Sequence, residues 1–152
     1  MTICIRYAAI GSAFIIGLWS AGASAATLIA DEEAKRPNPP QSIKVRGISR
    51  GPAVLFEEPS GVVLEHAPFE FKVKLETHGG ATIAPGNVRV TYLKAPSIDL
   101  TERLRPFITA QGIDMPTAQV PAGEHVLRVD VEDSEGHTSQ AVITLTAAKQ
   151  TR

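Results

Sequence analysis

Histidine is the side chain best suited to hold copper or zinc, and this chain contains four. They are His66, His78, His125 and His137. No two have the close spacing of a metal-binding motif, and the single cysteine, Cys4, lies near the N-terminus. His125 and His137 flank the strands of a predicted hairpin, so they could approach across it with Asp133 or Glu135 as a third ligand. The alternative, which we favour, is that they are solvated loop histidines and that the chain holds no metal and no other cofactor.

Four carboxylates also gather in the stretch between these histidines. They are Asp130, Glu132, Asp133 and Glu135. Calcium prefers such oxygen ligands, but the spacing of an EF-hand loop is absent. Asp130 and Glu132 are two residues apart and therefore share one face of a strand. We interpret the cluster as a solvated face rather than a calcium site.

A third group of residues has the chemistry of an acid–base pair beside an anion clamp. Asp99 and Glu102 are the carboxylates, and Arg103 and Arg105 are the cations. The alternative, which we favour, is a capped turn in which Asp99 or Thr101 binds backbone N–H groups and the arginines lie in solvent. The sequence contains no nucleophile elbow, zinc-protease motif or phosphate-binding loop. We therefore predict no catalytic residues and expect that the protein is not an enzyme.

The residues that would position these groups alternate in the manner of β-strands. Leu127, Val129 and Val131 alternate with polar residues, a turn follows at residues 133–136, and Ala141, Ile143 and Leu145 resume the alternation. Side chains of a strand point to opposite faces in turn, so residues 124–145 are predicted to form a hairpin with one buried face.

Two further stretches show the same period of two. Phe69, Phe71, Val73 and Leu75 alternate with charged residues, and Val88, Val90 and Tyr92 alternate with Arg89 and Thr91. We expect Tyr92 in the core, with its hydroxyl bonded to a backbone group. Shorter strands are predicted near residues 53–56, 62–64, 97–101, 107–110, 113 and 118–120, and one helical turn is predicted over residues 101–105.

The N-terminal residues 1–25 have the features of a secretory signal peptide. Arg6 is followed by the apolar run of residues 8–19 and by the small residues Ala23-Ser24-Ala25. A retained membrane anchor is the alternative, but the apolar run is shorter than the ~20 residues of a bilayer span. Residues 26–50 are predicted to be a flexible arm, because charges and prolines follow each other there. Residues 51–148 are the predicted domain, and residues 149–152 a polar tail.

About seven strands separated by turn residues, without a long amphipathic helix, predict an all-β, antiparallel sandwich of two sheets. A small barrel is the alternative that strand count leaves open. The residues from Pro121 to Gly136 resemble the closing hairpin of bacterial immunoglobulin-like domains, with a Gly-x-His lead, an alternating strand and an Asp-x-x-Gly turn. Pro59-Ser60-Gly61 and Ala67-Pro68-Phe69 resemble the entry to the first long strand of those domains.

That resemblance covers about the last 100 residues and implies an immunoglobulin-like sandwich that serves as an adhesive, spacer or accessory module. We therefore expect a non-catalytic protein-interaction module, periplasmic or secreted, whose partner is an unknown envelope or extracellular protein. An exposed sheet edge and the arm Ile43–Arg50 are the surfaces most able to bind by strand addition. The alternative function is periplasmic copper or zinc binding through the hairpin histidines. The formal net charge of −1 gives no electrostatic reason to expect nucleic acid or stable membrane insertion after signal cleavage.

Overall fold

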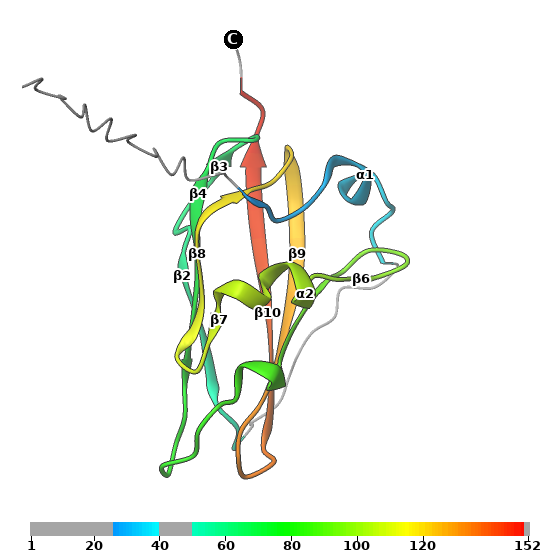
Figure 1. The fold of residues 1–152 in the computed structure, drawn as a ribbon. Coiled ribbons are helices and arrows are strands. Elements are labelled where there is room, and N and C mark those ends of the chain that lie inside the picture. Colours follow the sequence, from blue (N-terminus) through cyan, green and yellow to red (C-terminus); the bar gives the residue numbers. More distant parts are fainter. Residues whose placement is uncertain (1–25, 40–49, 151–152) are drawn as a thin grey trace, which may run out of the picture.

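The computed structural model describes residues 26–39 and 50–150, and in them two β-sheets pack face to face (Figure 1). Within these residues, none of the helices is long and apolar enough to cross a membrane. The predicted signal peptide, residues 1–25, lies outside the described residues, as do residues 40–49 and the end of the polar tail.

The first sheet combines a short strand of the N-terminal residues with strands from the middle of the sequence. Its members are β1 (Ala26–Thr27), β2 (Ala53–Glu58), β4 (Phe69–Glu76), β7 (Ile108–Thr109) and β8 (Gly112–Gln119). Their order is β1-β8-β4-β2, and β7 also pairs with β8. All pairs are antiparallel except the short pair of β1 with β8, which is parallel.

The second sheet is built around the predicted hairpin. Its members are β3 (Val63–Leu64), β5 (Val88–Tyr92), β6 (Ile98–Asp99), β9 (Gly123–Glu132) and β10 (Thr138–Ala148). Their order is β3-β10-β9-β5-β6. β10 pairs with β9 in antiparallel register from Thr138 to Ala147, whereas β3 runs parallel to β10 and pairs with its last two residues only.

The helical elements are short and connect the sheets. They are α1 (Asp31–Ala34), α2 (Thr101–Leu104) and the single 3-10 turns η1 (Pro85–Asn87) and η2 (Arg105–Phe107). α2 and η2 carry the chain from β6 in the second sheet to β7 in the first, which confirms the predicted helical turn over residues 101–105.

The core consists of the residues that alternation predicted to face inward. Phe71, Leu127 and Val129 are fully buried, and Val73 and Leu145 are 1% exposed. Phe69, at the start of β4, is half-buried against the same cluster. A slip of one residue would move each of these side chains to the solvent face, so burial of the apolar set fixes the register. The predicted all-β, two-sheet sandwich is therefore confirmed.

The strand order matches that of an immunoglobulin-like sandwich, in which β2, β4, β8 and β7 form one sheet and β5, β9 and β10 lie at the heart of the other. The two sheets remain separate, so the sandwich and not the barrel describes the fold. The described residues contain ten strands rather than about seven, because the alternation pattern cannot reveal two-residue strands that exist only through their pairing.

The prediction of separate short strands near residue 113 and at residues 118–120 is wrong. β8 is a single strand of eight residues despite Pro116. Its pairing with β4 shifts register between Phe69 and Phe71, which face Ala118 and Met115. Pro116 therefore lies at a bulge, where a missing backbone donor costs no ladder hydrogen bond.

The prediction that residues 26–50 form a flexible arm is wrong for residues 26–39. Leu28 and Ile29 are 0% and 1% exposed and belong to the main hydrophobic cluster. The Leu28 N–H donates to Gln119 O over 2.9 Å, which continues the pairing of β1 with β8. Residues 26–39 therefore pack as part of the sandwich, and we call them the N-terminal strap.

Arg103 fastens this strap to the body of the domain. Its guanidinium donates to both carboxylate oxygens of Glu33 at 2.9 Å and to Leu28 O at 2.7 Å. This hydrogen-bonded guanidinium holds the pKa of Glu33 below its ordinary value, against the opposing effect of partial burial. A bidentate pair of this kind fixes orientation as well as adding attraction. Arg103 thus has a structural partner and does not lie free in solvent as the capped-turn interpretation expected.

Candidate functional site

His125, the first candidate metal ligand, is a buried structural residue. Its side chain lies on β9 and is 1% exposed. Nε2 is 2.8 Å from Pro121 O, and Nδ1 is 2.8 Å from the Tyr92 hydroxyl. A carbonyl only accepts, so Nε2 carries the proton and Nδ1 accepts from Tyr92. Both ring nitrogens are therefore occupied, and the hydroxyl of core residue Tyr92 has a side-chain partner instead of the expected backbone one.

Burial sets the protonation of both members of this pair. It lowers the pKa of His125 below 6.5, and the nearby Lys94 ammonium acts in the same direction, against the opposing effect of the Pro121 carbonyl. Burial also raises the pKa of Tyr92 to about 12. Lys94 lies 5.4 Å from the centre of the Tyr92 ring and donates to Asn38 Oδ1 at 2.7 Å. Through Lys94, the neutral pair is thus linked to Asn38 of the N-terminal strap.

His137, the second candidate, lies in the turn at the far end of the hairpin. Asp133 Oδ1 accepts from the backbone N–H groups of Glu135 and His137, both at 2.9 Å. His137 Nδ1 is 3.4 Å from Asp133 Oδ2 and 3.5 Å from Glu135 Oε2. Burial alone would raise the pKa of Asp133, but the two N–H groups and His137 outweigh it and hold that pKa below its ordinary value. Asp133 therefore organises the turn.

The two histidines do not approach across the hairpin, so the metal-site alternative gains no shared pair of ligands there, and the favoured interpretation as solvated loop histidines is wrong for His125, which is buried on β9. His125 is opposite Leu145, whereas His137 immediately precedes Thr138, which is opposite Glu132. Seven residues of strand separate these levels, which is about 23 Å at 3.3 Å per residue. Across residues 26–39 and 50–150, no three His, Cys, Asp or Glu side chains gather in a way that could hold a metal ion. Copper or zinc binding stays a prediction that this hairpin geometry does not favour.

His66 and the acid–base candidates also have local partners, whereas His78 lies at the surface. His66 Nε2 is 3.5 Å from Asp31 Oδ1 on α1. His78 lies exposed in the turn after β4. Asp99 Oδ1 accepts from the Thr101 N–H at 2.8 Å, which is the capping role that we favoured. Hydrogen bonding from the Thr101 side chain, and then from its backbone N–H, holds the pKa of Asp99 below its ordinary value. Glu102 pairs with Arg105 at the surface, so the supposed acid–base pair and its clamp are divided among separate contacts.

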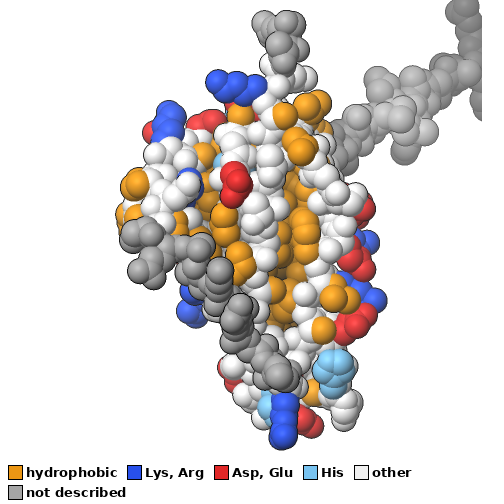
Figure 2. Space-filling view, turned by 180° about the vertical axis from the view of Figure 1, so that it is seen from behind, with side chains coloured by type: hydrophobic (Ala, Val, Ile, Leu, Met, Phe, Trp, Pro, Cys, Tyr) orange, Lys and Arg blue, Asp and Glu red, His pale blue; other side chains and the backbone are white. Residues whose placement is uncertain are grey.

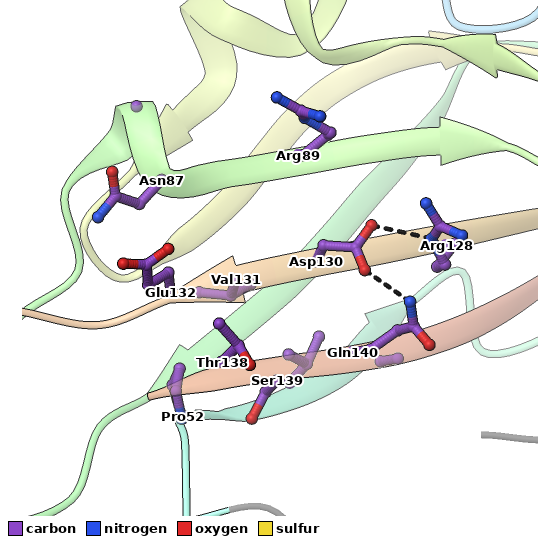
Figure 3. Close-up of a pocket in the computed structure, with 13 residues that line it drawn as sticks. Pro52, Asn87, Arg89, Arg128, Asp130, Val131, Glu132, Thr138, Ser139 and Gln140 are labelled. Atoms are coloured by element: carbon purple, nitrogen blue, oxygen red, sulfur yellow. Dashed lines mark hydrogen bonds and ion pairs between the residues drawn. The ribbon is translucent and has the colours of Figure 1, made fainter. Parts of the chain in front are cut away.

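The acidic residues of β9 form part of an open groove of about 800 Å³ on the second sheet. Asp130 accepts from Arg128 Nε at 2.9 Å and from Gln140 Nε2 at 2.7 Å, so three neighbouring side chains satisfy each other across two strands (Figure 3). Glu132 is exposed. Asp130 and Glu132 share a solvated face, as the sequence pattern indicates.

One sheet edge of the described residues is unprotected: the edge of β10 on the side of the sandwich between β2 and β10. β10 contains no charged residue and no proline in eleven positions. β3 pairs only with the last two residues of β10, so within residues 26–39 and 50–150 no strand pairs with Gln140–Thr144 on that side, although β2 lies nearby. Native sheet edges are usually protected by charges, prolines or covering segments. This edge lacks the first two over its whole length.

Hydrophobic side chains accompany this open edge. Seen from behind Figure 1, they form a stripe along the length of the molecule (Figure 2). Phe56 on β2 packs against Phe71 at a ring distance of 6.1 Å and yet remains 37% exposed. Val62 and Val142 are 65% and 37% exposed. A groove of about 420 Å³ lies between the Phe56–Val62 segment and the β10 residues Thr144 and Thr146. We call this surface the β2–β10 trough.

The sequence predicted an exposed sheet edge able to pair with a partner strand, but it did not identify which strand forms that edge. The signal was present, because β10 is the only strand longer than two residues in the described chain without a charged side chain. What the sequence could not show is that its neighbour β3 ends after two pairs. The arm residues Ile43–Ser49, also predicted to bind a partner, lie outside the described residues.

Comparison with known proteins assigns this chain to no family. No family model matches the chain, and no curated protein matches it. One solved structure, CopC from Methylosinus trichosporium OB3b, is similar with a TM-score of 0.42 and 13% sequence identity. The alignment covers 66% of this chain and 98% of that one. No residue role is carried over from it, because both the identity and the TM-score are low.

Proposed function

We propose that this protein is an exported, non-catalytic β-sandwich module that binds another protein through the β2–β10 trough. The supporting observation is the uncharged edge of β10 over Gln140–Thr144, with which no strand of the described residues pairs, beside the exposed side chains of Phe56, Val62 and Val142. Contiguous apolar surface beside unpaired backbone groups is typical of interaction sites. Export is proposed from the signal-peptide pattern of residues 1–25.

The contacts of the acid–base and metal-ligand candidates support the non-catalytic part of this proposal. Asp99 caps α2, Arg103 holds the N-terminal strap, and His125 is closed between Tyr92 and Pro121. Each of these groups already has a contact that stabilises the fold. A site for chemistry needs convergent groups that remain free to meet a substrate.

Site-specific photo-crosslinking in cells that express the chain tests this function. A photo-reactive amino acid at Thr144, in the trough, should give one discrete crosslinked product. The same amino acid at Leu55, which is also exposed and lies on β2 but does not line the groove, should give none. Adding Val142→Lys should reduce the Thr144 product at least fivefold, because a charge then lies beside the apolar stripe.

The comparison between the two crosslinking positions tests the proposed binding surface, whereas a crosslink at one position alone does not. Equal products from Thr144 and Leu55, or a Thr144 product that Val142→Lys leaves unchanged, would contradict binding at the trough.

A further inference from the structure

The free part of the β10 edge is a slot of defined length that is closed at both ends. At its upper end β3 pairs with Ala147 and Ala148. At its lower end Gly51 passes so close that an added Cβ would lie 2.7 Å from Ser139 Oγ and from Thr138 O. Between these contacts lie the seven residues Gln140–Thr146, which span about 23 Å at 3.3 Å per residue.

The backbone groups of every second residue in the slot point outward. Ala148 O accepts from the Glu65 N–H at 2.8 Å, so Ala148 directs its backbone toward the β3 side. Backbone direction alternates along a strand, and the β9–β10 register is continuous. Thr144, Val142 and Gln140 therefore direct both their N–H and C=O groups to the same side, where no described strand meets them, whereas the carbonyl of Thr146 is already engaged by the parallel pairing of β10 with β3.

The closed ends decide what kind of occupant fits. A second copy would offer its own β10, which is eleven residues long and is continued by a hairpin turn. Such a strand would meet β3 at one end and Gly51 at the other. A linear segment of a partner can pair over seven residues and bend away at both ends, so it fits where the edge of another folded sheet does not.

The side chains around the slot define the chemistry of that segment. Residues that face into the sandwich would cover the exposed part of the Phe56 ring, so apolar side chains are required at alternate positions. Among the residues that line the groove between the Phe56–Val62 segment and β10, Glu57 is the single charged one, and it is exposed. A basic side chain at the end of the segment near β3 would complement it.

We propose that the trough captures a linear, extended peptide segment of about seven residues, with alternating apolar side chains and a basic residue at one end, as an added strand on β10. This inference rests on the proposed function and specifies its partner. The main-chain hydrogen bonds of an added strand supply affinity, and alternate side chains supply specificity.

A displayed library of random linear nine-residue segments, selected on the purified full-length chain, provides the probe. The selected peptide is then synthesised with N-methyl groups at either of the two alternate sets of backbone positions. Methylation of the set that faces β10 should weaken binding at least tenfold, because several backbone hydrogen bonds are lost. Methylation of the other set should change binding less than threefold.

Charge exchange at Glu57 provides the matched test of orientation. Glu57→Lys should weaken the basic peptide about tenfold, and a peptide with glutamate in place of its basic residue should recover the loss. Glu132→Lys, at an exposed position of β9 away from the upper groove, is the control and should change neither peptide.

The inference is overturned if no peptide is selected, if both methylated sets bind alike, or if the chain forms a dimer whose interface contains β10. A site-specific Thr144 crosslink together with any of these results would leave the proposed function standing and remove only the linear segment. Loss of the Thr144 crosslink would remove both.

Discussion

Replacing Leu28 by alanine should lower the free energy of unfolding by about 2–5 kcal/mol. Leu28 is 0% exposed although it lies only two residues after the first described residue. Its side chain belongs to the same cluster as Phe71 and Leu127, so truncation leaves a cavity in the main core. Denaturant unfolding followed by circular dichroism measures the change, and the slope with denaturant should stay the same.

Leu55→Ala is the matched control, because it removes the same atoms from a side chain that is 43% exposed. It should cost less than about 1 kcal/mol. If the two variants were equally stable, the N-terminal strap would not be part of the folded domain. A flexible arm over residues 26–39 would then describe the molecule better than the arrangement in Figure 1.

The second large effect is a loss of stability in mild acid that depends on His125. Its pKa lies below 6.5 in the folded chain because burial disfavours the imidazolium. In the unfolded chain the ring titrates near its ordinary value, so the unfolded state binds a proton first as the pH falls. The stabilisation is complete above about pH 6.5 and is lost as the pH drops toward the lower folded pKa, by up to about 1.4 kcal/mol per pH unit.

Denaturant unfolding at several pH values between 5 and 7 measures this slope. His125→Leu should remove the part of the slope that begins near pH 6.5, although it also lowers stability at neutral pH because Pro121 O and the Tyr92 hydroxyl lose their partner. Tyr92→Phe leaves Nδ1 of His125 without its donor and should cost about 1–3 kcal/mol at pH 7. A slope that is the same with and without His125 would show that the ring is not buried in neutral form.

Alternation in the sequence predicted the strands whose side chains face the core, and it failed where structure depends on pairing alone. β4 and β9 have four or more alternating pairs, which leave one possible buried face. β1 and β3 have two residues each, too few to show any period. Leu28 and Ile29 form a short apolar pair followed by charged residues and then prolines, so only their contact with β8 reveals that they belong to the core.

For the candidate sites, the sequence identified residues of suitable chemical type but not which of them lie close together in space. His125 and His137 are close in sequence and far apart in space, because a hairpin brings together residues at equal distance from its turn and these two are not. Tyr92 and His125 are 33 positions apart in the sequence and lie on different strands, so no local sequence pattern reveals their contact. The β10 edge left a trace in the sequence, the uncharged stretch of residues 138–148, but its open side depends on where β3 ends.

Backbone amide hydrogen exchange along β10 tests the open edge most directly. The N–H groups of Val142 and Thr144 should exchange at least a hundredfold faster than those of Ile143 and Leu145, which point to β9. Slow exchange at all four amides in the isolated protein would mean that the edge is already covered, and the proposed binding trough would not exist.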